Sequence, residues 1–388
     1  MSRTESTRHR TELAYLTDEW GRNPLASIER ALFPASLRAG LAFDGVYTDD
    51  ATPEVEQGSC RRINLGSVRA AWATPKLVRY MRSARPKAVI VHSGQLGPAT
   101  VLAGWITRTP VVVWEPTITS FEVASVGPRI RLMFFLQRLL YRRAAALAGP
   151  SRDVVKWASA NRGVPSDRVF LWPNAFDIEE VRSWAGDQGP QPEPPLRLIA
   201  VGRLVEQKGY DILIEALALA DPDLPEWQLE ILGVEGVWRG NWEARTETMV
   251  REHGLEGKVR LVGQVDDPLK FFPSLKRSDL FVHAARWEAF GSVIVEAMAC
   301  GAPVIVTDCP GAPKEILDGG RFGRLVSNED PAAFARALVE LANDPAERAR
   351  LAEAGRQRAF AYSADHLIPG MLADIERVSG VDFQPAVR

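Results

Sequence analysis

The sequence predicts an α/β protein built from two Rossmann-like domains that face each other across a cleft. Short β-like runs alternate with helical patterns along the chain, which is typical of parallel sheets covered by helices. The alternation is interrupted once, by a stretch rich in Gly, Pro and polar residues at 184–196, and then starts again. A length of 388 residues fits two domains, and a hydrophobic content of 46% is enough for two cores.

The first domain is expected over residues 1–183, followed by a linker at 184–196. Its apolar runs predict strands at 13–17, 87–92, 110–114, 146–150 and 169–173, with a helical segment around 128–145. Most of the tryptophans of this half are expected in the core; they are Trp20, Trp72, Trp105, Trp114, Trp157 and Trp172.

The second domain is expected over residues 197–365. Its predicted strands lie at 197–202, 227–233, 259–263, 279–285, 303–308 and 323–326, with helices from about 209 and near 243–253. A C-terminal helix, 366–388, is expected to pack back toward the first domain. Because ligands of parallel sheets bind beyond the carboxyl ends of the strands, the site is expected in the cleft between the domains.

Charge and cysteine content limit the classes of function. The net charge is −2, but residues 1–190 carry about seven excess positive charges and the remainder about nine excess negative ones. Either an anionic partner of the first half or a solvated arginine surface explains this asymmetry. We expect no nucleic-acid partner. The three cysteines, Cys60, Cys300 and Cys309, have neither metal-ligand nor disulfide spacing.

No run of eighteen apolar residues occurs, and the first residues lack the apolar core of a signal peptide. A cytoplasmic location is therefore expected. The segment 129–147 is both basic and apolar. It is interpreted either as a peripheral contact with the inner face of a membrane or as a partly buried helix with arginines along its rim.

The stretch 286–308 places two acids around the start of a predicted helix. Gly291 precedes the helix, and a helix start binds anions through its free N–H groups. Helical side chains lean toward the N-terminus, so Glu296 is aimed back at that anion site, while Glu288 reaches it from the loop. Two acids around an anion site fit a sugar diphosphate. The alternative is that Glu296 stabilises the first helical turns and Glu288 is an exposed loop acid.

Two cations follow the first strand of the same half. That strand ends at Gly202, Arg203 comes directly after it, and Lys208 precedes the next helix. Arginine offers paired donors and lysine a mobile charge, so both suit a diphosphate at the carboxyl end of the sheet.

The second half resembles the retaining, nucleotide-sugar-dependent glycosyltransferases of GT-B architecture, the family-four type (glycosyl transferases group 1). The resemblance rests on "GRLVEQKG", on two glutamates with seven residues between them, and on "EAMACGAPVIVTD", "GAPKEIL" and "GRLV". It covers roughly residues 87–375 and is strongest from 197 to 326.

The resemblance implies roles for particular residues. Arg203 and Lys208 would neutralise the donor diphosphate, Glu288 would contact the transferred sugar, and Glu296 would hold the ribose hydroxyls. The residues expected to act in catalysis are Glu288, Arg203 and Lys208. Those expected to bind the donor are Gly202, Arg203, Lys208, Phe290, Gly291, Ser292, Val293, Glu296 and Val265. The resemblance also implies no metal, no cofactor besides the sugar donor as co-substrate, and no protein nucleophile or general base.

The departures from the family pattern concentrate in the first half, which is expected to bind the acceptor. The acceptor-side residues expected there are Trp20, Gly21, His92 and Glu115. The acceptor is a hydroxyl of a lipid-linked sugar, in bacterial surface polysaccharide or glycolipid synthesis, or of a small natural product such as an aminoglycoside or other antibiotic. A nucleotide-sugar epimerase and a sensor without catalysis are the other interpretations.

Overall fold

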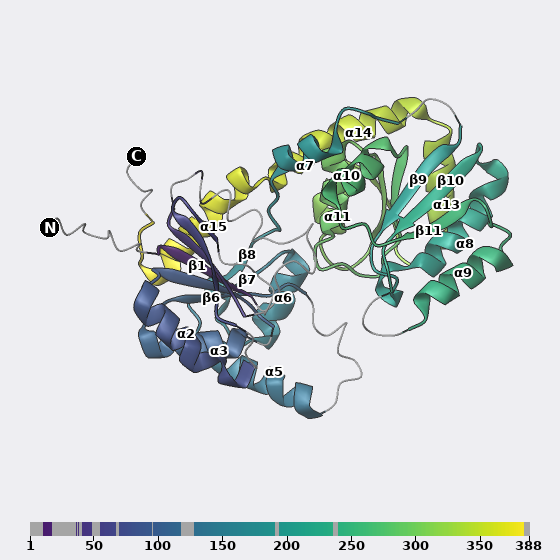
Figure 1. The fold of residues 1–388 in the computed structure, drawn as a ribbon. Helices are drawn as coiled ribbons and strands as arrows, with labels where there is room; N and C mark the ends of the chain where they lie inside the picture. The colour runs from purple at the N-terminus through teal and green to yellow at the C-terminus, as the bar shows by residue number, and fades with distance from the viewer. Residues whose placement is uncertain are drawn as a thin grey trace. The chain divides into compact units, whose positions relative to one another are not determined.

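A computed structural model describes residues 11–17, 36, 38, 41–48, 55–66, 70–94, 96–117, 128–190, 194–235 and 240–383. The chain forms two compact units, shown in Figure 1. Residues 1–175 and 364–388 make the first unit, and residues 176–363 make the second. None of the described helices is long and apolar enough to cross a membrane.

The described part of the first unit contains a sheet with strand order β3-β4-β2-β1-β5-β6-β7-β8. Neighbouring strands are parallel except β3 and β4, which are antiparallel. The strands are β1 (Leu13–Thr17), β2 (Phe43–Tyr47), β3 (Val55–Gln57), β4 (Cys60–Asn64), β5 (Ala88–His92), β6 (Val111–Trp114), β7 (Ala146–Gly149) and β8 (Val169–Leu171). The helices are α2 (Ala70–Ala84), α3 (Gly97–Thr107), α5 (Pro128–Tyr141), α6 (Arg152–Asn161) and α15 (Ala364–Ser379).

Both faces of this sheet are covered by helices, because alternate strand residues point to opposite sides. Leu13 and Tyr15 of β1 belong to the core under α15, whereas Ala14 and Leu16 belong to the core under α2 and α3. Helix α3 contacts both α2 and α5, so the three helices form one layer, which Figure 1 shows on one face of the sheet. The sheet is therefore buried on both sides, as its apolar strands predict.

Strands β2, β3 and β4, toward one end of this sheet, were not expected from the sequence. Strand β2 contains Asp44 and Gly45, two residue types that are depleted in strands. Asp44 is nevertheless fully buried, because Arg61 of β4 donates two hydrogen bonds to its carboxylate, at 2.9 and 2.8 Å. A tertiary ion pair thus outweighs the local preference of this segment.

The tryptophans of the first unit are divided between the core and the surface. Trp114 and Trp172 are 6% and 1% exposed, as expected. The expectation was wrong for Trp72 on α2 and Trp105 on α3, which are 73% and 61% exposed. These two side chains lie on the outer surface of the helix layer rather than under it.

The second unit contains an all-parallel sheet with strand order β11-β10-β9-β12-β13-β14. The strands are β9 (Leu196–Val201), β10 (Trp227–Leu232), β11 (Val259–Gly263), β12 (Leu280–His283), β13 (Val304–Asp308) and β14 (Arg324–Ser327). The helices are α7 (Ile178–Ala185), α8 (Tyr210–Ala220), α9 (Trp242–Glu252), α10 (Pro268–Arg277), α11 (Ser292–Cys300), α12 (Pro313–Ile316), α13 (Pro331–Ala342) and α14 (Pro345–Ala359). Short 3₁₀ turns lie at Ser166–Arg168, Glu206–Lys208, Asp221–Asp223, Asp318–Gly320 and Phe360–Tyr362 of the chain.

The strand order creates a switch point between β9 and β12. From β9 the chain moves outward through β10 to β11, and it then returns to the other side of β9 for β12, β13 and β14. Ligands of doubly wound sheets bind beyond the carboxyl ends of the strands at such a point. The loops after β9 and β12 are therefore where this fold offers a site.

The units divide the chain at other positions than the domains expected from the sequence. The second unit begins at Phe176, so it includes α7, whereas the first domain was expected to continue to residue 183. The backbone N–H of Phe176 donates to the carbonyl of Tyr362 at 2.9 Å, and α7 contacts α10 and α11. The expected linker, 184–196, runs from the end of α7 to the first residue of β9.

Helix α15 belongs to the first unit, although it follows the second unit in the chain. Its residues Ile368, Met371 and Ile375 are buried in the same core as β1 and β5. The indole Nε1 of Trp172 donates to the Asp374 carboxylate at 3.0 Å. The last helix thus completes a core that the first residues of the chain begin.

Candidate functional site

The loops at the switch point of the second unit bring a cation and a carboxylate together. Lys208 ends the 3₁₀ turn after β9, and Glu288 lies in the loop after β12. The two are 80 residues apart in sequence, yet the Lys208 ammonium donates to Oε1 of Glu288. Arg203, directly after Gly202 at the end of β9, is exposed.

The Glu288 carboxylate is buried together with its partners. Glu288 is 6% exposed, and the side chains of Lys208 and His283 are 13% and 3% exposed. Nε2 of His283, at the end of β12, lies 2.9 Å from the same Oε1. One buried carboxylate oxygen therefore has both a cation and an imidazole as neighbours.

The electrostatics of this cluster keep Glu288 ionised. Burial by itself raises the pKa of the Glu288 carboxyl, but the charge of Lys208 and the hydrogen bond with His283 outweigh it and lower the pKa to about 2. Burial also lowers the pKa of His283. At neutral pH the histidine is therefore uncharged, and because a carboxylate only accepts, it is Nε2–H that donates to Glu288.

The backbone of Glu288 is held by the loop after β13. Its N–H donates to the carbonyl of Pro310 at 2.9 Å, and Glu288 forms a β-bridge with Gly311. Gly311 has φ of +122°, and a Cβ at this position would lie 1.3 Å from the Glu288 carbonyl oxygen. Only glycine permits so close an approach, so the place of Glu288 depends on it.

A second ion pair ties the two loops together at their base. The Arg286 guanidinium donates to both oxygens of Asp211 at 2.8 Å, a bidentate arrangement. The N–H of Arg286 donates to the carbonyl of Gln207 at 2.8 Å, and the Gln207 amide donates to the carbonyl of Trp287 at 3.0 Å. The loop after β9 and the loop after β12 thus form one rigid support for Lys208 and Glu288.

Helix α11 begins beside this cluster, at Gly291, which has φ of +91°. Phe290 is 4% exposed, and its ring stacks on Phe176, with the centroids 6.3 Å apart. Ser292 and Val293 are half-buried in the first turn of the helix.

Beyond its first turn α11 is buried on all sides, because every residue from Ile294 to Cys300 is buried. The reason is tertiary: α7, α10 and α14 all contact this helix. Glu296 is 3% exposed. Burying a carboxylate in the second turn of a helix costs folding free energy unless polar groups interact with it.

The other predicted donor residues lie at the same edge of the sheet. Gly202 accepts a hydrogen bond from the Tyr210 hydroxyl at 2.8 Å through its carbonyl. Val265 is half-buried in the loop after β11. Since all strands are parallel, the loops that carry Gly202, Val265 and Glu288 project from one edge.

Of the acceptor-side predictions, Trp20 and Gly21 lie outside the described residues. His92 is half-buried at the end of β5, and its ring centroid lies 5.4 Å from that of Trp114. Glu115, after β6, is 1% exposed and pairs with the buried Arg162 at 2.6 Å. Its role toward an acceptor stays a prediction.

Several contributors to the site were not identified from the sequence. His283, Arg286 and Asp211 act through partners that lie up to 75 residues away in the chain. His283 gave a weak signal, because it is a polar residue at the carboxyl end of a buried strand. Within the described residues, no cluster of three or more His, Cys, Asp or Glu side chains has the geometry of a metal site.

The arrangement has the chemistry of a site for an anion with hydroxyl groups on either side. The exposed Arg203, the Lys208 ammonium and the positive end of the α11 helix dipole attract negative charge. The carboxylates of Glu288 and Glu296 are acceptors for hydroxyl groups.

Comparisons with known proteins identify the family. Residues 186–358 match the family described as glycosyl transferases group 1. Residues 35–175 match the glycosyl transferase 4-like domain.

The similar curated proteins include three bacterial glycosyltransferases. The lipopolysaccharide core biosynthesis glycosyltransferase LpsE of Rhizobium meliloti is 36% identical over 41% of this chain and 43% of its own length. The putative colanic acid biosynthesis glycosyltransferase WcaL of Salmonella typhimurium is 32% identical over 66% of this chain and 62% of its own. An N-acetylgalactosaminyltransferase of Campylobacter jejuni that acts on a diphospho-undecaprenol-linked sugar is 28% identical over 66% of each chain. The matches thus span less than two thirds of these relatives.

Solved structures show the same fold. Sucrose-phosphate synthase from Thermosynechococcus elongatus has a TM-score of 0.71 at 23% identity and covers 94% of this chain and 98% of its own. Anabaena HepE in complex with UDP-glucose has a TM-score of 0.73 at 19% identity and covers 96% of this chain and 100% of its own. With two family models matched along its length and this fold in both units, the chain belongs to the GT4 family of glycosyltransferases, a retaining, metal-independent group of GT-B architecture.

Proposed function

We propose that this chain transfers a hexose-type sugar from a nucleoside diphosphate sugar to a hydroxyl acceptor, with retention of the anomeric configuration and without a metal. The observation that carries the proposal is the cluster at the switch point of the second unit. There Lys208 is held against the buried carboxylate of Glu288, and Arg203 is exposed beside them.

In this proposal the donor diphosphate lies between Arg203, Lys208 and the start of α11. The N–H groups after Phe290 and Gly291 supply further donors without side-chain entropy. Lys208 then binds the diphosphate, while its positive charge still compensates the negative charge of the ionised Glu288.

The two acids take the hydroxyl groups. Glu288 accepts from hydroxyls of the transferred sugar, and the buried Glu296 accepts from the ribose hydroxyls. The base lies against the loops after β10 and β11, near Val234 and Val265. Val234 is 37% exposed, so it offers an apolar surface to a planar ring.

The chemistry then follows from electrostatics. The bond between the anomeric carbon and the diphosphate oxygen breaks, and a bond to the acceptor oxygen forms on the same face of the sugar. The departing diphosphate oxygen takes the acceptor's proton, so the products are a glycoside and a protonated nucleoside diphosphate. Arg203, Lys208 and the α11 N–H groups stabilise the charge that develops on the leaving group, which is the largest contribution the protein makes.

We propose a UDP-hexose as the donor. HepE has been solved with UDP and with UDP-glucose, and this chain shares its fold. A thermal-shift screen that includes GDP-, dTDP- and ADP-sugars beside UDP-sugars tests the identity of the base.

We propose as acceptor a lipid-linked sugar of surface polysaccharide or glycolipid synthesis, at the inner face of the cytoplasmic membrane, with the segment 129–147 as a peripheral contact. The lipopolysaccharide, colanic acid and undecaprenol-linked relatives support it. A small polar acceptor is the second candidate. It is favoured by D-inositol 3-phosphate glycosyltransferase of Streptomyces avermitilis, 32% identical over 45% of this chain and 38% of its own.

Calorimetric titration with UDP tests the site. Arg203→Ala is expected to weaken UDP binding by about 2–3 kcal/mol, roughly 30- to 150-fold, because a charge-assisted contact is lost. Arg260→Ala is the matched control, because this arginine is the second residue of β11, far from the carboxyl edge, and its side chain is 67% exposed. Equal affinity of wild type and Arg203→Ala would reject the diphosphate assignment.

A turnover assay tests the reaction. With donor and acceptor present, NMR of the product is expected to show the anomeric configuration of the donor. An epimerase would instead convert the donor without an acceptor, and a sensor would bind the donor without consuming it.

A further inference from the structure

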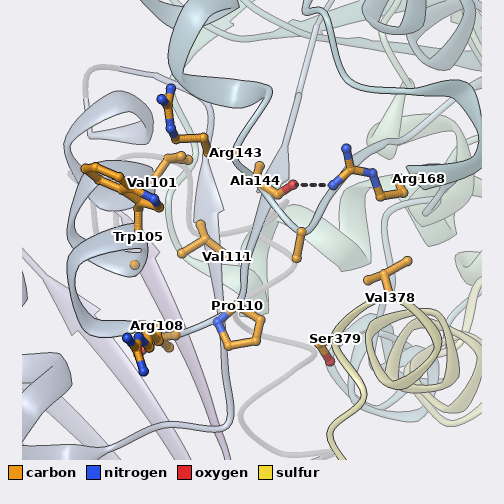
Figure 2. A pocket seen from close by; sticks show the side chains of 13 residues that line it. Val101, Trp105, Arg108, Pro110, Val111, Arg143, Ala144, Arg168, Val378 and Ser379 are labelled. Atoms are coloured by element: carbon orange, nitrogen blue, oxygen red, sulfur yellow. Dashed lines mark hydrogen bonds between the residues drawn. The ribbon is translucent and has the colours of Figure 1, made fainter.

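The first unit contains a hollow beside the amino ends of its sheet strands. Its volume is about 400 Å³. Pro110 and Val111 at the start of β6, and Ala144 and Ala145 before β7, line it. Figure 2 shows Pro110, Val111 and Ala144 between Trp105 on one side and Val378 of α15 on the other. Rossmann-like sheets bind their ligands at the other edge, where His92 lies, so this hollow is separate from the sites that the fold predicts.

Three arginines from three different elements line the hollow. Arg108 ends α3, Arg143 follows α5, and Arg168 ends the 3₁₀ turn before β8. The described residues that line it include no acidic side chain. The Arg168 guanidinium donates to the carbonyl of Ala144 at 3.2 Å, drawn as a dashed line in Figure 2, which leaves most of its five N–H donors for a ligand.

An exposed tryptophan forms the outer rim of the hollow. Trp105 is 61% exposed, and the Arg143 guanidinium lies over its ring, 5.2 Å from the centroid. Its neighbour Ile106 is 45% exposed. An apolar ring beside cations is the combination found where a protein meets a membrane interface.

An apolar stripe on α5 leads to this rim. Leu132, Phe135, Leu136 and Leu139 are 59%, 63%, 43% and 45% exposed. Their spacing of three and four residues places them on one face of the helix, and Arg143 lies in the turn that follows the helix. The opposite face of the helix packs against the rest of the first unit, as the exposed fractions of Gln137 and Tyr141, 2% and 0%, show. The α5 stripe is thus an outward surface of the protein.

The charge around the stripe has a single sign. The sequences of α2, α3 and α5 contain no Asp or Glu, whereas the described side chains of Lys76, Arg79 and Arg82 on α2 and of Arg138 on α5 are cations. An apolar stripe whose described charged neighbours on these helices are cations is complementary to an anionic bilayer, where apolar side chains enter the acyl boundary and arginines meet phosphate.

We propose that the helix layer α2–α3–α5 docks on a bilayer containing anionic phospholipid, with the α5 stripe and Trp105 in the interface and a lipid phosphate in the arginine-lined hollow. This deepens the membrane location in the proposed function and adds a headgroup site to it. It rests on that location but not on sugar transfer, so binding is measured without donor or acceptor.

Sedimentation with vesicles tests the proposal. The wild-type chain is expected to sediment with phosphatidylcholine vesicles that contain phosphatidylglycerol, and to stay in the supernatant with phosphatidylcholine alone. Arg108→Gln and Arg143→Gln are each expected to lower partitioning by about fivefold, from the contribution of one arginine near an anionic surface. Leu139→Gln is expected to lower it at low and at high salt, because its contribution is apolar.

Matched controls separate the hollow from general charge and apolar effects. Arg82→Gln removes one exposed charge from the same helix layer outside the hollow, and it is expected to cost less than Arg108→Gln. Leu269→Gln changes a side chain of α10 that is 66% exposed, and it is expected to have no effect. All these positions are at the surface, so the variants should keep the wild-type melting temperature.

Three results would overturn the proposal. The first is a wild-type chain that does not bind anionic vesicles. The second is equal loss for Arg82→Gln and Arg108→Gln, which would remove the headgroup site. The third is a wild-type chain that forms a dimer, does not bind vesicles, and becomes a monomer in the Leu139→Gln variant. The α5 stripe would then be a contact between two copies of the chain. In each case UDP binding to the second unit still reports separately on the proposed function.

Discussion

Replacing Lys208 by methionine tests whether the buried Glu288 depends on its cation. The side chain of Lys208 is 13% exposed, and Glu288 is 6% exposed, so solvent screens their interaction little. The pKa of Glu288 is lowered from its ordinary value of 4.5 to about 2. At 1.36 kcal/mol per pH unit, this lowering corresponds to about 3 kcal/mol of stability for the folded second unit.

We expect Lys208→Met to lower the free energy of unfolding of the second unit by about 3 kcal/mol at pH 7, because it leaves a buried charge without its partner. Because the pKa of Glu288 is lower in the folded state, this stabilisation is present above about pH 4.5 and is lost as the pH falls toward 2. The difference between variant and wild type should therefore shrink in that window. The double variant Lys208→Met, Glu288→Gln should regain most of the loss, since a neutral amide needs no cation.

Native-state hydrogen exchange at the amides of β12 is the assay, because it reports on the second unit within the whole chain. Lys314→Met is the control: its side chain is 63% exposed and pairs with Asp308 at 3.0 Å, so its loss should cost less than about 1 kcal/mol. The reasoning is refuted if Lys208→Met costs no more than this control, or if the double variant is no more stable than Lys208→Met alone.

Three further predictions concern buried groups. Glu115→Gln deprives a buried arginine of its carboxylate and should cost about 3–5 kcal/mol in thermal or urea unfolding, and a cost below about 1 kcal/mol would contradict a tight pair. Gly311→Ala should weaken UDP binding at least about tenfold by calorimetry, because its Cβ would meet the carbonyl of Glu288. Gly254→Ala, at φ of +67° with open space around it, is the control and should leave UDP affinity unchanged. Burial raises the pKa of Cys309 to about 12, so its thiol should react with Ellman's reagent at pH 8 only when the chain unfolds, and rapid labelling of the native protein would show it exposed.

The fold was predictable where local pattern and tertiary role agree. The strands of the second unit are apolar runs ended by Gly or polar residues, and β10 at Trp227–Leu232 lies within one residue of its predicted bounds. The run at Phe43–Tyr47 carries Asp44 and Gly45 and was not recognised. Its strand forms because Arg61 balances the buried Asp44, and that contact joins positions far apart in sequence.

The candidate site was predictable as a set of positions but not as a network. Parallel strands place Arg203, Lys208 and Glu288 at one edge, and their positions after predicted strands together with the resemblance to the family identified them. That Lys208 and His283 share one oxygen of Glu288 follows from the packing of loops 80 residues apart. Local pattern holds no information about such an approach. The same holds for α11, where helices packed from three sides bury the face on which Glu296 lies.

The return of α15 to the first unit sets an order for folding on the ribosome. Domains generally fold as their residues emerge, beginning with the N-terminal one. Here the core around Leu13 and Tyr15 is completed by Ile368 and Met371, which are synthesised only after the whole second unit. The second unit, residues 176–363, is complete before then. The first unit is thus completed after the second, and a nascent chain interrupted before residue 364 would carry a folded second unit beside a first sheet that lacks the helix of one face.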